Sequence, residues 1–196
     1  MLFDIIQRSI LEAIEIQNYL KNPESIDFVM QLSATIVEVY ETQKKFIIAG
    51  NGGSLCDADH FSEELSGFFR SRSRPAIGAI SLSQPAHITC VANDIGFEQV
   101  FSRAIESLGQ MGDVFVAIST SGNSKNLYNA LVLARKKGLK TIAFLGGDGG
   151  VMRGMSDLEW IVPGFGFSDR IQEVHMSAIH IAIEAAESKI LSLAHA

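Results

Sequence analysis

The segment that most constrains the fold joins a short apolar run to a hydroxyl-rich turn. Residues 114–118 are all apolar, which is typical of a strand buried on both faces of a sheet. The sequence STSGNS follows at residues 119–124 and holds four hydroxyl groups and a glycine. A helical pattern of apolar residues then begins near Lys125. We therefore expect a buried strand that passes through a polar loop into the N-terminus of a helix.

The hydroxyl-rich turn at residues 119–124 predicts a phosphate site. A helix N-terminus has unpaired backbone N–H groups and the positive end of the helix dipole, and both attract an anion. The alternative is a turn whose serines only cap the helix. Four hydroxyl groups exceed what one cap needs, so phosphate binding is the favoured interpretation.

Short apolar runs and helical patterns alternate along the whole chain. The expected strands are residues 45–49, 77–82, 114–118, 140–145 and 158–162. The expected helices are residues 3–20, 25–44, 55–67, 85–92, 97–108, 125–137 and 168–193, with one helical turn at 151–155. This order predicts an α/β fold, a three-layer αβα sandwich around a five-stranded parallel sheet. Ligands bind at the carboxyl ends of such strands, so the loops at 50–54 and 119–124 can face one pocket.

Composition excludes several classes of protein. The 196 residues are 47% hydrophobic and 19% charged, as expected for one globular domain. The net charge of −6 argues against a nucleic acid as partner. No apolar run reaches the ~18 residues of a membrane span, and no signal peptide is recognisable. Cys56 and Cys90 fit no disulfide or metal pattern, which indicates free thiols in a reducing cytoplasm.

The two amphipathic helices expected within residues 1–44 precede the first strand. A minimal α/β layer does not need them, and their apolar stripes require a partner. We therefore expect a single domain over residues 1–196 in which residues 1–44 form a helical extension used in oligomerisation.

His60 and Glu64 are four residues apart on the helix after the glycine loop, so they share one face. A histidine and a carboxylate at this spacing can ligate a metal ion or act together in proton transfer. The alternative is an exposed pair on a solvated helix, and spacing alone favours that alternative.

The last expected helix carries two more histidines. His180 stands among isoleucine and alanine residues, so a core histidine and a functional one are about equally compatible with its surroundings. His175 has the weaker case and is interpreted as structural. His87 and His195 have no supporting context, and His195 lies in the tail of the chain.

Several motifs in this order together resemble a known family. They are GNGGS (50–54), DHFSEEL (59–65), AND (92–94), STSGNS (119–124) and RIQEVH (170–175). The chain resembles the sugar isomerase (SIS) domain proteins over nearly its whole length, and within them the phosphoheptose isomerases. That resemblance implies an aldose–ketose isomerase that converts sedoheptulose 7-phosphate to D-glycero-D-manno-heptose 7-phosphate, the first step of nucleotide-heptose synthesis for lipopolysaccharide or related glycans.

The resemblance also assigns roles to residues. Glu64 and His180 would be the acid/base pair. One Zn²⁺ per subunit would be held by His60, Glu64, Gln172 and His180. The substrate would contact Asn51, Gly52, Gly53, Glu64, Asn93, Asp94, Ser119, Thr120, Ser121, Ser124, Asp169 and Gln172. Members of this family are cytoplasmic homotetramers with sites between subunits, so a homo-oligomer, as a tetramer, is implied.

Two segments depart from the family pattern, and three rival functions remain open. Residues 70–74 and 165–168 differ from relatives and could alter which sugar tail is accepted. One rival is a non-catalytic SIS protein that binds the bacterial replication initiator, but such proteins lack the residues that match Glu64 and His180. The others are an isomerase for another sugar phosphate, usually with added domains, and a sugar-phosphate-sensing regulator.

The spacing of Gln172 and His180 raises a question about assembly. Eight residues on one straight helix separate their Cα atoms by about 12 Å along the axis. One metal ion bound by both would therefore be strained, because zinc bonds to nitrogen and oxygen are only about 2 Å long. Our hypothesis from sequence is that Glu64 and His180 of one site come from different subunits.

Overall fold

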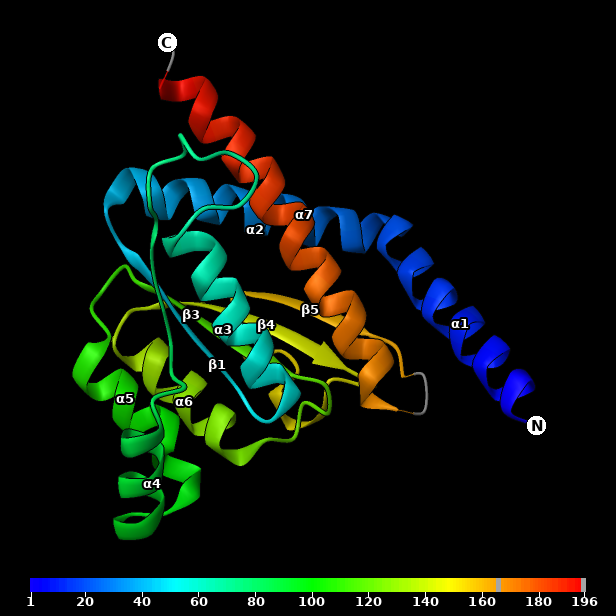
Figure 1. Cartoon of the computed structure of the whole chain (residues 1–196). Helices are drawn as coiled ribbons and strands as arrows, with labels where there is room; N and C mark the ends of the chain where they lie inside the picture. The colour runs from blue at the N-terminus through cyan, green and yellow to red at the C-terminus, as the bar shows by residue number, and fades with distance from the viewer. Residues whose placement is uncertain (165–166, 195–196) are drawn as a thin grey trace.

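Five parallel strands form one sheet with the order β2-β1-β3-β4-β5 (Figure 1). The structure is a computed structural model that describes residues 1–164 and 167–194. The strands are β1 (Lys45–Gly50), β2 (Gly78–Ser81), β3 (Val114–Ser119), β4 (Lys140–Gly146) and β5 (Leu158–Val162). The predicted five-stranded parallel sheet is confirmed, and all the strand bounds agree with the expected ones to within a residue.

Helices connect the strands, as the alternating pattern predicts. The α-helices are α1 (Leu2–Asn18), α2 (Pro23–Thr42), α3 (Gly53–Ser66), α4 (Pro85–Asp94), α5 (Val100–Leu108), α6 (Lys125–Lys136) and α7 (Ser168–Ala194). Short 3-10 turns lie at Tyr19–Lys21, Phe97–Gln99 and Gly150–Met152. The helix expected at 97–108 therefore begins as a 3-10 turn, and α3 starts two residues earlier than expected. Within the described ranges, no helix is long and apolar enough to cross a membrane.

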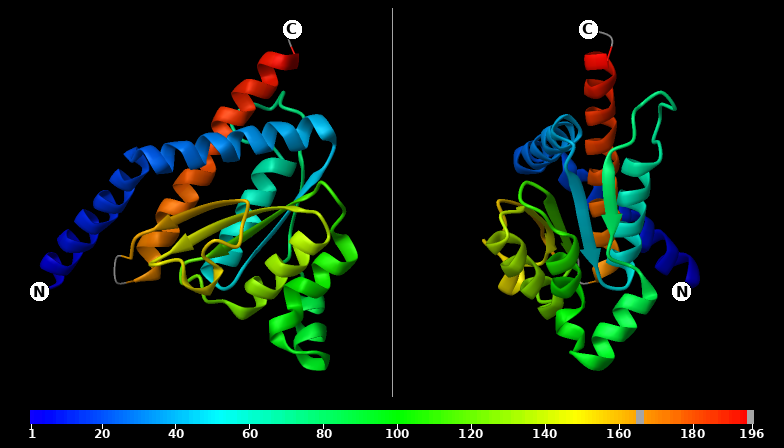
Figure 2. Two further views of the ribbon diagram at one scale, coloured as in Figure 1. Left: turned by 180° about the vertical axis from the view of Figure 1, so that it is seen from behind. Right: turned by 90° about the vertical axis from the view of Figure 1, so that its left-hand side faces the viewer.

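The sheet lies between two layers of helices, each with its own apolar core (Figure 2). Along β1, Phe46 and Ile48 pack with α2, α3 and α7, whereas Ile47 and Ala49 pack with α4, α5 and α6. This division follows from the alternation of side chains along a strand. The expected three-layer αβα sandwich is confirmed.

The two N-terminal helices differ in how they pack. The core contains five apolar side chains of α2: Phe28, Val29, Leu32, Ile36 and Val39. Only Ile16 of α1 is buried, while Leu2, Phe3 and Ile10 are more than half exposed. Figure 1 shows α1 projecting away from the sheet. Helix α2 is therefore part of the layer, and α1 is left with an uncovered apolar face.

His175 is fully buried on α7, against the rings of Phe144 and Trp160. Its Nε2 lies 3.1 Å from the carbonyl oxygen of Leu145 and donates to it, because a carbonyl can only accept. Burial lowers the pKa of His175 to about 4, an effect partly offset by this hydrogen bond. His175 is therefore a structural residue of the core, as the sequence predicts.

The low pKa of His175 predicts a loss of stability in acid. Above the unfolded pKa of about 6.5 the ring is neutral in both states, and its contribution is fully present. As the pH falls from there toward about 4, only the unfolded chain takes up the proton, so stability falls. Urea unfolding at pH 7.5 and pH 4.5 should show that wild type loses roughly 2 kcal/mol more unfolding free energy than His175→Phe. Equal losses in the two proteins would contradict this origin.

Candidate active site

The loops after β1 and β3 meet at the point where the strand order reverses. Strand β1 lies between β2 and β3. The chain runs from β1 to β2 on one side of it and then crosses to β3 on the other side. Such a switch point opens a crevice at the carboxyl ends of the strands. Asn51 and Asn126 exchange two amide hydrogen bonds there, of 3.0 and 2.9 Å. The loop after β1 is therefore bonded to the first turn of α6, the helix that begins directly after the loop at 119–124.

The serines of the second loop do not serve simply as helix caps. Ser124 occupies the N-cap position of α6 but makes no side-chain capping hydrogen bond. Its Oγ lies 3.3 Å from Oγ of Ser119, which also accepts the N–H of Gly122 at 3.2 Å. The hydroxyl groups thus line the loop at the N-terminus of α6, a position that suits an anion.

The loop after β3 is braced by the loop after β4. Gly122 has a φ of +63°, and a Cβ added there would lie 2.0 Å from the carbonyl oxygen of Gly149. The carbonyl of Gly122 also accepts the N–H of Met152 at 3.1 Å. Only glycine combines this conformation with so close an approach of two backbones. Beside this contact lies a cavity of about 280 Å³, lined by residues that include Thr120, Ser121 and Ser168.

Helices α3 and α7 bring three candidate residues together in one chain. His60 Nε2 lies 3.4 Å from Glu64 Oε1, as their spacing on one helix face predicts. His60 Nε2 also lies 2.9 Å from His180 Nε2 on α7. All three side chains are half-buried, and their ligand atoms lie within 4.8 Å of one another. The prediction from spacing alone, that His60 and Glu64 form an exposed pair on a solvated helix, is therefore wrong.

The hypothesis that Glu64 and His180 come from different subunits does not fit this arrangement. Helix α3 packs along α7 in the same chain and carries Glu64 to His180 directly. The distance argument holds for Gln172, whose Nε2 instead donates to Asp57 Oδ1 at 3.0 Å. Gln172 and His180 thus lie at different places along α7, and a second subunit is not needed to join Glu64 with His180.

The three clustered residues fit a divalent metal ion. Tetrahedral zinc has bonds of about 2.0–2.1 Å to nitrogen and oxygen, which sets neighbouring ligand atoms about 3.3 Å apart. The separations of 2.9 Å between the imidazole nitrogens and 3.4 Å from His60 to Glu64 are close to that value. In the part of the chain that the structure describes, this is the only such group of at least three His, Cys, Asp or Glu residues.

Burial shifts the pKa values of the two proton-transfer candidates in opposite directions, toward each other. Burial raises the pKa of Glu64, Glu63 raises it further, and the positive charges of His60 and Arg74 oppose the rise. Burial also lowers the pKa of His180, with further lowering by the positive charges of His60 and Arg70. The raised pKa of Glu64 favours proton exchange by this carboxyl group nearer to neutral pH, and the lowered pKa of His180 favours its neutral ring.

Sequence reasoning missed two residues that hold this region together. Asp57 is 5% exposed and accepts the amide of Gln172. Burial raises its pKa, and the hydrogen bond from Gln172 opposes that rise. It precedes His60 by three residues, so helix spacing could have indicated that both share one face. Asn126 is buried beyond the serine loop, and no sequence signal pointed to its pairing with Asn51.

Other candidate residues lie around the site without joining the cluster. Gly52 is the N-cap of α3 and Gly53 its first residue, and a Cβ on Gly53 would lie 2.4 Å from Gln172 Oε1. Asp169 is exposed in the first turn of α7 and lies 3.2 Å from Arg170. Asp57, Asp169 and Gln172 line a cavity of about 1040 Å³ that α1 partly encloses.

Asn93 and Asp94 stand apart from the rest. They are exposed at the end of α4, and the Asn93 amide donates to Asp94 at 2.6 Å. Within residues 1–164 and 167–194, no hydrogen bond links them to the other candidate residues. Of the remaining sequence candidates, Phe165, Gly166 and His195 lie outside the described residues.

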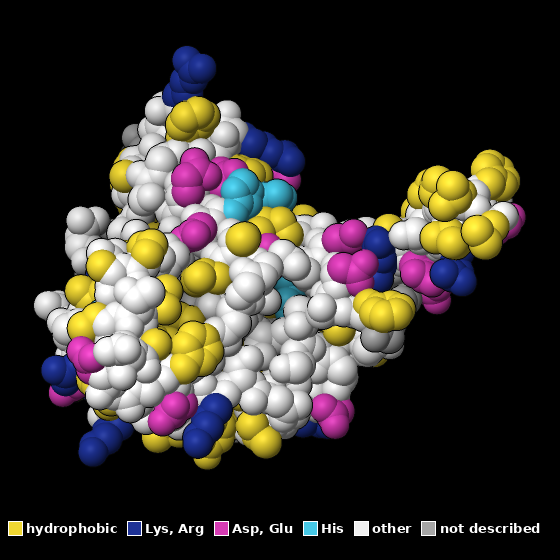
Figure 3. Space-filling view, turned by 60° about the horizontal axis from the view of Figure 1, so that its bottom comes forward, with side chains coloured by type: hydrophobic (Ala, Val, Ile, Leu, Met, Phe, Trp, Pro, Cys, Tyr) yellow, Lys and Arg dark blue, Asp and Glu magenta, His cyan; other side chains and the backbone are white. Residues whose placement is uncertain are grey.

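The cluster is accessible from solvent. Figure 3 shows histidine side chains reaching the surface beside acidic ones. His60 and Glu64 keep 41% and 15% of their side-chain surface exposed, so a small molecule can approach them.

Comparison with known proteins identifies the family to which the chain belongs. The sequence model of the SIS domain matches residues 14–146. The chain belongs to the SIS domain family. The match spans β1, β3 and the loops that follow them, so both candidate loops of this SIS protein lie in the part that the family model covers.

Relatives and solved structures extend the likeness to nearly the whole SIS protein. It is 46% identical over 188 residues to the phosphoheptose isomerase of Pectobacterium atrosepticum, covering 95% of this chain and 97% of that one. The phosphoheptose isomerase structure from Neisseria gonorrhoeae has a TM-score of 0.88 and 31% identity, and covers 96% and 100% of the two chains. The one from Francisella tularensis has a TM-score of 0.89 and 30% identity, and covers 96% and 99%.

Proposed function

We propose that this SIS protein is a phosphoheptose isomerase, which interconverts sedoheptulose 7-phosphate and D-glycero-D-manno-heptose 7-phosphate. The observation that carries the proposal is the meeting of Glu64 and His180 in a chain whose relatives bear that name. The reaction opens nucleotide-heptose synthesis for lipopolysaccharide or a related glycan.

The geometry supports an aldose–ketose exchange through an enediolate. This reaction moves a proton between adjacent carbons and a second proton between the two oxygens. The N-terminus of α6 and the serine loop hold the phosphate, which fixes the sugar so that C1 and C2 lie at α3 and α7. Glu64 takes the carbon-bound proton and returns it to the neighbouring carbon. His180 moves the proton at the oxygens.

A metal ion completes the proposed site. His60, Glu64 and His180 would hold Zn²⁺, one per subunit, whereas Gln172, the fourth ligand that the resemblance implies, donates to Asp57 instead. Lewis-acid polarisation of a carbonyl oxygen is the chemistry that such an ion supplies when bound. A carboxylate has two oxygens, so Glu64 can bind with one and accept a proton with the other.

Incubation of the purified protein with sedoheptulose 7-phosphate tests the proposal, with aldose formation followed by NMR. A signal for the heptose 7-phosphate that grows with enzyme concentration is the expected result. No conversion, with or without added Zn²⁺, would contradict the proposal and favour the initiator-binding alternative. Conversion of another sugar phosphate alone would favour the isomerase of different specificity.

Ser121→Ala and Ser124→Ala are expected to raise the KM for the substrate about 10–100-fold while kcat changes little. Ser121 lines the cavity beside the loop, and Ser124 stands at the N-terminus of α6. Loss of one hydrogen bond to a charged phosphate corresponds to about 1.5–3 kcal/mol of binding. Steady-state kinetics and inhibition by inorganic phosphate measure the effect. Unchanged KM and phosphate inhibition in both variants would show that the phosphate binds elsewhere.

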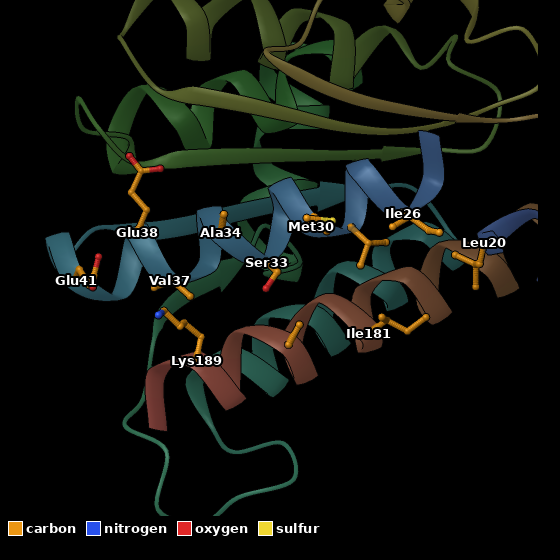
Figure 4. Close-up of a pocket in the computed structure, with 12 residues that line it drawn as sticks. Leu20, Ile26, Met30, Ser33, Ala34, Val37, Glu38, Glu41, Ile181 and Lys189 are labelled. Atoms are coloured by element: carbon orange, nitrogen blue, oxygen red, sulfur yellow. The ribbon is translucent and has the colours of Figure 1, made fainter. Parts of the chain in front are cut away.

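The enzyme is proposed to act as a homo-oligomer, as a tetramer, in the cytoplasm. A groove of about 610 Å³ between α2 and α7 is lined by exposed apolar side chains that include Ile26, Met30 and Ile181 (Figure 4). Together with the uncovered face of α1, it supports a role for residues 1–44 in assembly. The exposed free thiols Cys56 and Cys90 suit a reducing compartment. Sedimentation analysis measures the number of subunits.

A further inference from the structure

The loop between α3 and β2 carries an arginine whose side chain is entirely buried. Arg74 has no side-chain surface exposed, although arginine is rarely buried unless it is paired. Its guanidinium donates to the carbonyl oxygens of Glu64 at 2.7 Å and Leu65 at 3.0 Å, at the end of α3. It also donates to the carbonyl of Pro75 at 2.7 Å. Arg74 therefore holds the last turn of the helix that carries Glu64.

The same guanidinium is paired with a carboxylate on α7. Arg74 Nε lies 3.1 Å from Oε2 of Glu187, whose side chain is 5% exposed. The other oxygen of Glu187 accepts the backbone N–H groups of Arg70 at 3.1 Å and Ser71 at 2.7 Å. All three donors come from the loop that follows α3. Glu187 follows His180 by about two helical turns on α7.

Arg74 and Glu187 thus join the two helices that supply the proton-transfer pair. One guanidinium bonds the main chain at Glu64 on one side and the side chain of Glu187 on the other. The loop that they anchor also places the ring of Phe69 with its centroid 5.7 Å from that of His180. We propose that Arg74, acting with Glu187, is a positioning residue that fixes Glu64 relative to His180 for the isomerisation. This inference rests on the proposed function.

The bridge between Arg74 and Glu187 lies outside the site, but it should affect the rate of isomerisation because it sets the positions of the reacting groups. A displacement of about 1 Å at the reacting groups can cost about 10²-fold in rate. Residues that orient metal ligands typically contribute about 10–100-fold in metal affinity or activity. The serine loop is anchored separately, through Asn126 and the loop after β4. Loss of the bridge is therefore expected to lower kcat and zinc affinity but not phosphate affinity.

Glu187→Gln tests the bridge with almost no change of shape. The amide oxygen can still accept the N–H groups of Arg70 and Ser71, which leaves the NH₂ group facing the N–H donor of Arg74. Arg74→Lys is the second variant, because one ammonium group keeps the charge but cannot span the same acceptors. For both variants we expect kcat to fall about 10²-fold while KM stays within about threefold of wild type.

Asp113→Asn is the matched control. Asp113 is a buried carboxylate, 1% exposed, that accepts two backbone N–H groups and one side-chain cation, as Glu187 does. Its donors are the N–H groups of Lys45 and Gln110 and the Nζ of Lys45. It precedes β3, at the end of the sheet opposite the loops of the site. The control should lower the melting temperature as Glu187→Gln does but keep the kcat and zinc affinity of wild type.

Kinetic assays are run far below the melting temperatures, and zinc affinity is measured by chelator competition. These measurements distinguish a role of the bridge in positioning the site from a role in stability alone. The expected result is a loss of kcat and of at least about tenfold in zinc affinity for Glu187→Gln and Arg74→Lys only. Equal losses in Asp113→Asn, or wild-type values in either bridge variant, would overturn the proposal. If Glu187→Gln does not fold, Arg74→Lys decides alone. Wild-type protein without isomerase activity would refute the proposed function, and the zinc affinities would still test the bridge.

Discussion

Glu64→Gln is expected to lower kcat by about 10²–10⁴-fold and to leave the fold intact, because proton transfer by one positioned side chain typically contributes that much. An amide cannot accept the proton from carbon, and it is nearly the same size as the carboxylate. Glu64 is half-buried, with Oε1 3.4 Å from His60 Nε2. Replacement should therefore remove the base without opening a cavity.

Steady-state kinetics with sedoheptulose 7-phosphate, together with a thermal melt, measures this effect. Glu106→Gln is a suitable control, since it removes an exposed carboxylate paired with Arg103 on α5, in the opposite helix layer. That control should keep wild-type kcat. Turnover by Glu64→Gln near that of wild type would remove Glu64 from the mechanism.

His180→Gln is expected to lower kcat by a similar factor of about 10²–10⁴ and to reduce the zinc content of the purified protein. The imidazole lies 2.9 Å from His60 and packs against Phe69. Glutamine cannot exchange a proton near neutral pH, and its amide is a poorer metal ligand than imidazole. Kinetics and metal analysis measure the two losses independently.

His87→Gln is the matched control for this substitution. His87 lies on α4, and its Nε2 is 3.0 Å from the carbonyl oxygen of Val100, in the helix layer on the face of the sheet opposite α3 and α7. A mixing experiment adds a sharper check. Because one chain supplies both Glu64 and His180, mixed oligomers of the two inactive variants should stay inactive. Recovered activity would show that sites are shared between subunits.

Much of the fold could be predicted from local patterns in the sequence. The apolar run at residues 114–118 and the hydroxyl-rich turn after it determine a buried strand and a polar loop, because both depend on neighbours in the chain. Five such runs separated by helical patterns allow little other than a parallel sheet between helices. Such a sheet also places the loops at 50–54 and 119–124 at the same edge, beyond the carboxyl ends of the strands.

The cluster of His60, Glu64 and His180 could be predicted only in part. Helix spacing places His60 and Glu64 on one face, but it does not say what that face meets. His180 is 120 residues away in sequence, and its place beside His60 depends on how α3 packs along α7. From spacing alone, an exposed pair was the better prediction, and the tertiary structure reversed it.

The residue pairs that hold the site in place could be identified only from the tertiary structure. Arg74 and Glu187 are 113 residues apart, and Asp57 and Gln172 are 115 apart. Nothing in the charge or period of either segment identifies its partner. The sequence determined the strands, the loops and the residue types that can do the chemistry, because these depend on near neighbours. Only the packing of α3 against α7 decided which side chains face each other, because burial removes water and requires each polar group to find a partner.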